Sequence, residues 1–185
     1  MDIQSDCKDR KENLENSKIP KSTIIDLWND LNKKNKGSWI SVLSGSMAPL
    51  LQIDDKVLIR SIKPDEINFG DIIVFKDADR LVVHRVIRKY HHGVCEGYTF
   101  LQKGDATTTA EISSEEDVVG KVVSINKNGR VIDQNTGIWK FYNVFITLFS
   151  TSVYYLKPKN RILKKISRFF FNGVRSSSNF FLKKI

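Results

Sequence analysis

Short apolar runs separated by turn residues fill the middle of the chain. Rich in Val, Ile, Leu and Phe, they cover residues 39–43, 56–62, 71–75, 81–86, 98–101, 118–125 and 130–132. Runs of this composition and length, bounded by turn signals, predict the strands of an all-β domain. Asn128-Gly129 separates the last two runs and is the best two-residue hairpin signal in the chain. We therefore expect a mainly β domain that closes near Asp133.

The pattern before the first run is different. Residues 1–21 are polar and charged and contain no apolar segment. We expect a disordered leader there, and neither a signal peptide nor an N-terminal membrane anchor. Ser22 is a plausible N-cap, and apolar residues then follow at i, i+3, i+4 and i+7 (Ile24, Leu27, Trp28 and Leu31). This spacing predicts a short helix.

The pattern changes again after Gly137. Residues 141–156 carry no charge, but Asn143, Thr147 and the Ser/Thr residues at 150–152 interrupt them, so they are a weak candidate for a transmembrane span. Residues 157–185 contain nine of the 30 cations and none of the 21 acids, which leaves the rest of the chain neutral. The tail alternates cations with Phe, Ile and Leu, as segments on an anionic membrane surface do. The alternative is a basic helix that packs on the domain.

Three polar residues are candidates for chemistry. Ser46 lies in Ser44-Gly45-Ser46-Met47-Ala48-Pro49, directly after an apolar run. His84 interrupts an apolar run in which an imidazole needs hydrogen-bond partners, and Asp105 follows Gly104 at the end of another run. A nucleophile, a base and an orienting acid often come from separate segments in this way. A turn serine, a core histidine and a turn aspartate fit the same spacing, while His91 and His92 fall in a polar turn and are expected to be solvated.

At these residues the chain resembles the signal peptidase I family of serine peptidases. The matching blocks are Ser-Gly-Ser-Met-Ala-Pro (44–49), Asp-Lys-Val-Leu-Ile (55–59), Gly-Asp-Ile-Ile-Val-Phe (70–75), Val-Val-His-Arg-Val-Ile (82–87), Lys-Gly-Asp (103–105) and Val-Val-Gly-Lys-Val (118–122). They occur in the family's order and cover roughly residues 39–125. One such block is a weak signal, but six in order are a strong one.

The resemblance implies a set of site residues. His84 stands where the bacterial enzymes have a catalytic lysine, which is the Ser–His form of archaeal, endoplasmic-reticulum and some Gram-positive members. By this resemblance Ser46 is the nucleophile and His84 the base. Asp105 is the first choice for the triad acid. Glu111 is the second choice, because members of this form often carry an Asp about six residues further on. The oxyanion donors are the backbone N–H of Ser46 and the hydroxyl of Ser44.

The same resemblance implies the organisation and the substrate. We expect a β-rich catalytic domain over residues 22–137, between the leader at 1–21 and a basic, aromatic-rich helical tail at 138–185 that associates with a membrane. Substrates would be preproteins or leader peptides cut after small residues. No metal or organic cofactor is expected, because the histidines and cysteines lack ligand spacing.

Other functions stay open on the sequence. A cytoplasmic protease that matures a ribosomally made peptide would use the same Ser46–His84 chemistry without an N-terminal anchor. A non-catalytic module that binds peptides or a membrane surface would use Ser46 only as a turn residue. Binding of nucleic acid is not expected, since residues 1–156 are neutral overall and supply no basic face to support the tail.

Overall fold

The computed structural model describes residues 37–78, 80–93 and 97–156. The elements are β1 (Ser38–Ser41), β2 (Lys56–Arg60), η1 (Pro64–Glu66), β3 (Ile72–Asp77), β4 (Arg80–His91), β5 (Tyr98–Lys103), β6 (Ala110–Ser114), η2 (Glu115–Asp117), β7 (Val118–Lys127), β8 (Arg130–Asp133) and α3 (Gly137–Leu156). The expected leader, the helix after Ser22 and the tail beyond residue 156 lie outside the described residues. Each of the seven predicted runs overlaps a strand, so the prediction of a mainly β domain is confirmed.

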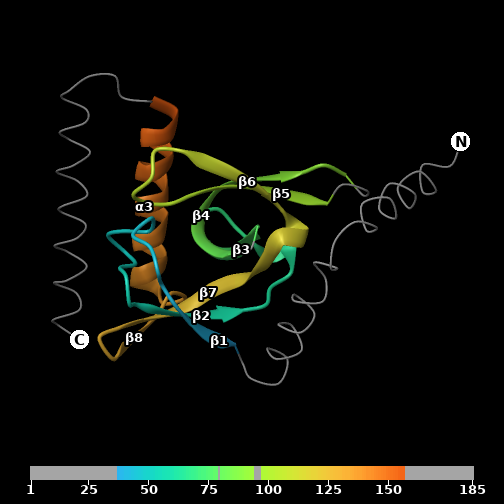
Figure 1. Ribbon diagram of the computed structural model, residues 1–185. Helices are drawn as coiled ribbons and strands as arrows, with labels where there is room; N and C mark the ends of the chain where they lie inside the picture. The colour runs from blue at the N-terminus through green and yellow to red at the C-terminus, as the bar shows by residue number, and fades with distance from the viewer. Residues whose placement is uncertain (1–36, 79, 94–96, 157–185) are drawn as a thin grey trace, which may run out of the picture.

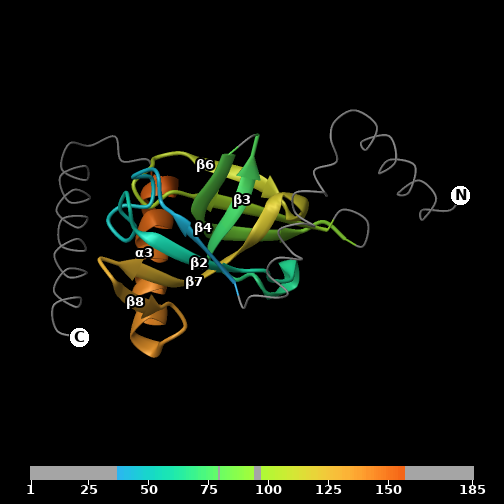
Figure 2. The ribbon, with the colours of Figure 1, turned by 60° about the horizontal axis from the view of Figure 1, so that its bottom comes forward.

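The strands form one curled antiparallel sheet. Its order is β1-β2-β7-β3-β4-β5-β6, and β8 pairs with the outer part of β7. Figure 1 shows the sheet wrapping around itself, with α3 lying along one side. In the turned view of Figure 2, β8 lies beside the first turns of α3. The curl brings the turn after β1 and the far strands β4 and β5 together on the same side as α3.

The pattern of apolar runs misses one strand, β6. It lies at an edge of the sheet and pairs only with β5, in a register that places Glu111 opposite Gln102. Its sequence, Ala-Glu-Ile-Ser-Ser, holds a single large apolar residue, and that residue, Ile112, is 70% exposed. An edge strand that buries little needs no apolar run, so hydrophobic patterning cannot reveal it.

β4 is the central strand for the site. It extends over twelve residues, beyond the predicted 81–86, and pairs with β3 and β5. Because side chains alternate along a strand, His84 and Arg85 lie on opposite faces of the sheet. His84 shares its face with a small core that includes Phe75 and Phe100. Arg85 shares the other face with a larger core that includes Ile72 and Trp139.

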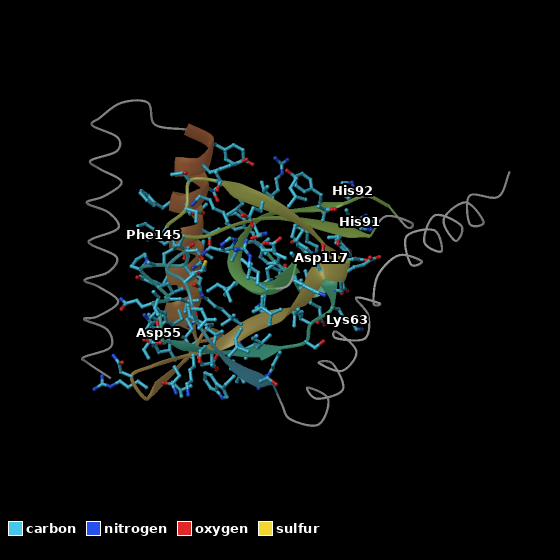
Figure 3. The ribbon with its side chains drawn as sticks, in the orientation of Figure 1. Asp55, Lys63, His91, His92, Asp117 and Phe145 are labelled. Atoms are coloured by element: carbon cyan, nitrogen blue, oxygen red, sulfur yellow. The ribbon has the colours of Figure 1, made fainter. Side chains whose placement is uncertain are left out.

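The helix α3 buries both polar and apolar residues against the domain and leaves a row of large apolar residues exposed on its outer side. Thr147 and Ser150 are buried, together with Trp139 and Ile146. The outer side carries exposed apolar residues at helical spacing, among them Ile138, Phe141, Phe145, Leu148 and Tyr155. Figure 3 shows Phe145 pointing away from the sheet. Within the described ranges, no helix is both long enough and apolar enough to cross a lipid bilayer.

Candidate active site

The turn that follows β1 presents Ser46. Its shape is closed by a hydrogen bond from the Ala48 N–H to the Gly45 carbonyl, at 3.0 Å. The Ser46 carbonyl accepts a hydrogen bond from the Ala106 N–H at 2.9 Å, which ties the turn to the loop after β5. The Ser46 Oγ lies 3.3 Å from the Ser44 Oγ, so the two hydroxyls can share a hydrogen bond. Ser46 is partly exposed, and the backbone hydrogen bond with Ala106 fixes its position.

His84 approaches the same place from β4. Its side chain is buried, and the Phe75 ring packs against the imidazole with centroids 5.8 Å apart. Gly104 lies between the imidazole and the serine turn. A Cβ atom placed on Gly104 would be 3.1 Å from the His84 Nε2 and 2.6 Å from the Ser46 carbonyl oxygen. The absence of a side chain at Gly104 therefore lets the two segments come together.

The predicted nucleophile and base are brought together without a direct hydrogen bond. In the part of the chain that the structure describes, no hydrogen bond links the Ser46 hydroxyl to His84. Catalytic hydrogen bonds are commonly long in enzymes without substrate and tighten when substrate binds. The Nε2 atom lies on the side of Gly104, and Nδ1 lies toward Gln102 and Glu111.

The Nδ1 atom of His84 has two polar neighbours. It lies 2.6 Å from the Gln102 Oε1 and 3.9 Å from the Glu111 Oε2. Burial lowers the pKa of His84 below its ordinary value, and the Gln102 hydrogen bond and the Glu111 charge raise it in part. The lowered pKa favours the neutral imidazole, which is the form that can accept a proton.

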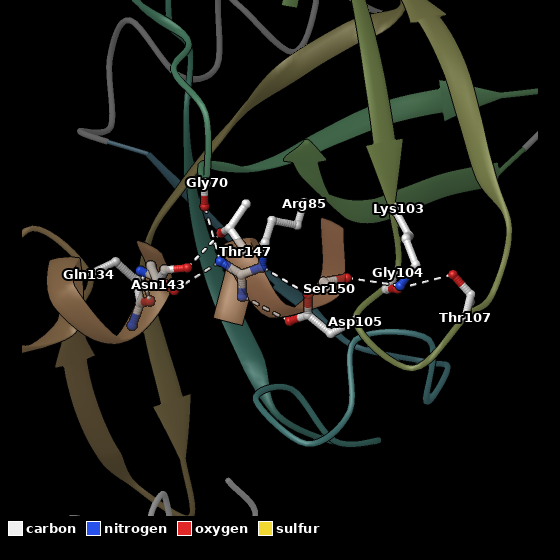
Figure 4. A network of polar contacts seen from close by, with 10 residues as sticks. All are labelled: Gly70, Arg85, Lys103, Gly104, Asp105, Thr107, Gln134, Asn143, Thr147 and Ser150. Atoms are coloured by element: carbon white, nitrogen blue, oxygen red, sulfur yellow. Dashed lines mark hydrogen bonds and ion pairs between the residues drawn. The ribbon is translucent and has the colours of Figure 1, made fainter. Parts of the chain in front are cut away.

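Asp105, the first choice for the triad acid, binds a different partner. Its two oxygens accept hydrogen bonds from the Arg85 Nε and Nη2, each at 2.8 Å, and both side chains are fully buried. The Arg85 Nη1 donates to the Gly70 carbonyl and to the Asn143 Oδ1, both at 3.0 Å (Figure 4). The carboxylate nearest the imidazole is that of Glu111. The geometry therefore favours the second choice over the first.

Lys103 is the other buried cation near the site. Its Nζ donates to the Gly104 carbonyl at 3.0 Å and to the Ser150 Oγ at 2.8 Å, on the α3 side of the sheet (Figure 4). Burial lowers the pKa of Lys103. Because its ammonium group is engaged by the Gly104 carbonyl and the Ser150 hydroxyl, Lys103 fixes the end of β5 to α3.

Two residues at the site were missed by sequence reasoning. Gln102 precedes the Lys-Gly-Asp block and Gly104 lies within it, and their roles follow only from the pairing of β5 with β4 and from the approach of the Ser46 turn. The one signal that the sequence offered for Gln102 was its position, a polar residue directly after the apolar run at 98–101. The solvated positions expected for His91 and His92 are confirmed, since both are exposed at the end of the β4–β5 hairpin (Figure 3).

A polar cavity is lined by Gln102 and Glu111, the two neighbours of the His84 Nδ1. It has a volume of about 400 Å³ and is lined by the end of β3, by η2 and by β6, with Gln102, Glu111 and Ser113 in its wall. Within the described ranges, no three His, Cys, Asp or Glu side chains gather as a metal site. The described residues bring together a turn with two serine hydroxyls and an imidazole whose lowered pKa favours the neutral form.

Comparison with known proteins adds an independent observation. No protein-family model matches the chain. It is similar to the signal peptidase complex catalytic subunit SEC11C of human, with 41% identity over 68 residues, or 36% of this chain and 35% of the relative. The signal peptidase complex catalytic subunits SEC11 of Fusarium vanettenii and Verticillium alfalfae are each 30% identical over 118 residues, which cover 56% of this chain and 67% of the relative.

These matches differ in how much of each relative they cover. The chain spans about a third of the length of the mammalian relatives, but two thirds of the fungal ones, at 35% and 67%. The β-rich fold agrees with the six sequence blocks in placing the Ser46 and His84 segments within one domain. On the fungal matches, the chain belongs to the signal peptidase family.

Proposed function

We propose that the protein is a serine endopeptidase of signal peptidase type, with Ser46 as nucleophile and His84 as general base. One observation carries the proposal: a Cβ placed on Gly104 would lie 2.6 Å from the Ser46 carbonyl oxygen and 3.1 Å from the His84 Nε2, so both segments lie beside Gly104 although they are 38 positions apart in the chain. A binding module has no evident need for a serine turn held against a buried neutral imidazole. The Ser–His form of the family fits this pair.

The reaction would be acyl transfer in two steps. The Ser46 Oγ attacks the carbonyl carbon of the scissile peptide bond while its proton passes to the His84 Nε2. The imidazolium then gives that proton to the leaving amine as the C–N bond breaks. A water molecule, deprotonated by the same nitrogen, releases the acyl group from Ser46 and restores the enzyme.

Two charges form during the reaction, on the imidazolium and on the tetrahedral oxyanion, and each needs groups that stabilise it. We assign stabilisation of the imidazolium to Glu111, whose carboxylate lies 3.9 Å from Nδ1, and a supporting role to Asp105, which holds the adjoining loop through Arg85. For the oxyanion we propose the Ser46 N–H and the Ser44 hydroxyl. Loss of one such donor costs about 3 kcal/mol of transition-state stabilisation.

The substrates we propose are preproteins or leader peptides cut after small residues; the relatives' names, signal peptidase complex catalytic subunits, support a substrate that carries a signal peptide. An extended peptide can add as a strand to the edge of a sheet. The edges of this sheet are β1, which leads into the Ser46 turn, and β6, which carries Glu111. A cytoplasmic protease that matures a ribosomally made peptide is the second candidate, because it would use the same two edges and the same pair.

A cleavage assay tests the catalytic proposal. Wild type, Ser46→Ala and His84→Ala would be incubated with a preprotein that carries an Ala-X-Ala site, and the products read by mass spectrometry. Ser41→Ala, an exposed serine on β1, is the matched control. We expect one cut after the small residue with wild type and the control, and a loss of at least about 10³-fold in the two site variants. Cleavage that survives Ser46→Ala would overturn the mechanism.

We further propose that the protein associates with an anionic membrane surface through α3 and the tail. The outer side of α3 exposes Phe141, Phe145 and Leu148, and the nine cations of residues 157–185 follow directly. Apolar surface and cations together bind anionic bilayers. The residues before 157 contribute no net charge.

Vesicle flotation tests this association with the full chain. We expect co-flotation with vesicles that contain phosphatidylglycerol, and about tenfold weaker binding to pure phosphatidylcholine. Replacing both Phe141 and Phe145 by Ser should weaken binding, while Ile112→Ser, an exposed apolar residue on β6, should not. Equal binding of both variants would place the contact elsewhere.

A further inference from the structure

We propose that Gln102 is a positioning residue for His84: its side-chain carbonyl fixes the imidazole in the tautomer that leaves Nε2 free to act as the base. The inference rests on the proposed function of the Ser46–His84 pair, but Gln102 lies outside the residues that the sequence blocks assign. It gives the site a neutral amide where a triad has a carboxylate.

The contact between the two side chains is short and sheltered. The Gln102 Oε1 lies 2.6 Å from the His84 Nδ1, and both residues are buried, Gln102 completely. They lie on neighbouring strands, β5 and β4, on the same face of the sheet. Buried hydrogen bonds between well-packed side chains fix orientation as well as adding stability. The imidazole is therefore held at Nδ1, while its other nitrogen, Nε2, lies beside Gly104.

The direction of this hydrogen bond decides which nitrogen is the base. A carbonyl oxygen only accepts, so Nδ1 must carry the proton. A neutral imidazole has one N–H, and Nε2 is then left with a free lone pair facing Gly104 and the Ser46 turn. The opposite amide orientation would donate to Nδ1 and place the proton on Nε2, which would abolish the base. The two orientations thus predict opposite tautomers.

The other groups around His84 cannot replace Gln102 in this role. Glu111 on β6 lies farther away, at 3.9 Å, and its side chain is 53% exposed. Asp105, in the loop after β5, is engaged by Arg85, and the Lys103 ammonium group is bound to α3. Phe75 on β3 contacts the ring without a polar group. Among the described residues, Gln102 is the partner within hydrogen-bond distance of Nδ1.

A neutral partner also has a chemical consequence. A carboxylate hydrogen-bonded to Nδ1 stabilises the imidazolium by its full charge, whereas an amide does so by its dipole alone. With Gln102 in place, burial is the main influence on His84 and keeps its pKa lowered. The pair then stays in the reactive, neutral state to lower pH than it would with a carboxylate at the same place.

The test measures the tautomer directly and activity separately. ¹⁵N chemical shifts of the His84 ring would be recorded by NMR on the full chain, with His84→Ala to assign the signals. The variants are Gln102→Leu, which removes the acceptor, and Gln102→Glu, which restores it with a charge. Gln134→Leu is the matched control, because Gln134 is also a buried glutamine with an unpartnered Nε2 among the described residues. The dispersion of amide signals reports whether each variant is folded.

We expect the Nδ1–H tautomer in wild type and in Gln134→Leu, and a mixture of tautomers in Gln102→Leu with kcat/KM reduced roughly 10- to 100-fold. Gln102→Glu should recover part of kcat and move the acid limb of the pH profile to higher pH. An Nε2–H tautomer in wild type, or an unchanged tautomer in a folded Gln102→Leu, would overturn the proposal. Because the NMR readout needs no substrate, these outcomes are separate from a failure of the cleavage assay.

Discussion

His84 and Arg85 are neighbours on β4, yet the two faces of the sheet treat them in opposite ways. Arg85 donates two hydrogen bonds of 2.8 Å to Asp105, and both side chains are fully buried. His84 has a neutral amide as its near partner and a half-exposed carboxylate at 3.9 Å. One face holds a buried ion pair, and the other holds an imidazole whose near partner is a neutral amide.

His84 and Arg85 stand side by side in one sequence block, but the difference in their partners suits them to two tasks: Arg85 to holding the fold and His84 to transferring a proton. A buried, bidentate ion pair is costly to disturb, so it suits a group that must not move. A catalytic imidazole must gain and lose a proton, and a neutral partner leaves both states within reach. Gly104 is close to both faces, since it follows Lys103, which pairs with Arg85, and a Cβ placed on it would lie 3.1 Å from the His84 Nε2. Substitutions on either face should therefore have separable effects on stability and on activity.

The largest expected effect is on stability, from breaking the charged pair. Asp105→Ala leaves the Arg85 guanidinium buried without its counter-ion, and such losses cost about 3–5 kcal/mol of unfolding free energy. Urea unfolding followed by circular dichroism measures this. The double variant Arg85→Met with Asp105→Leu should recover part of the loss, because no isolated charge remains buried. If Asp105→Ala is as stable as wild type, the ion pair does not hold this face of the sheet.

Gly104→Ala should produce a smaller loss of stability and a loss of activity. The added Cβ would lie within 2.6 Å of the Ser46 carbonyl oxygen, so the serine turn or the imidazole must shift. Overpacking of this kind costs about 1–3 kcal/mol, and a misplacement of about 1 Å can reduce kcat/KM roughly 10²-fold. Gly137→Ala at the start of α3, where an added Cβ would meet no atom within 4 Å, is a control for activity. Equal activity of Gly104→Ala and wild type would show that catalysis does not depend on the close approach of the serine turn and the imidazole at Gly104.

The smallest effect concerns the outer partner of His84. The Glu111 carboxylate raises the pKa of His84, so Glu111→Gln should lower that pKa and move the acid limb of the pH–activity profile to lower pH. Titration of the His84 ring by NMR measures the pKa, and Glu116→Gln, an exposed acid on η2, is the control. A shift to higher pH, or equal shifts in both variants, would contradict the assignment of Glu111.

The same titration has a consequence for stability. The folded protein holds the pKa of His84 below its ordinary value of 6.5, so the unfolded chain binds more protons in the interval between the folded pKa and 6.5. The free energy of unfolding should therefore fall as the pH drops through this interval. His84→Phe should remove that part of the dependence, which unfolding experiments at several pH values can measure.

Hydrophobic patterning was enough to predict seven of the strands, because each contains a buried apolar run. It missed β6, where an edge strand buries little, and so it could not show that Glu111 lies beside Gln102. The sequence blocks indicated Ser46, His84, Asp105 and Glu111, but they carry no information on which carboxylate meets the imidazole. That depends on strand pairing: Arg85 and His84 are adjacent in the chain and point to opposite faces of the sheet.

The inward polar face of α3 bears on where the molecule can be shortened. Asn143 and Ser150 supply acceptors to Arg85 and Lys103, two cations that are otherwise enclosed by the domain. A fragment cut at Gly137 would keep the residues of the Ser46–His84 pair, but it would leave both cations with acceptors missing and their surroundings open to water. An expression fragment designed to retain the site should therefore extend through Leu156. Asn143 and Ser150 are among the polar residues that make residues 141–156 a weak membrane span. Their hydrogen bonds to Arg85 and Lys103 attach the helix to the domain.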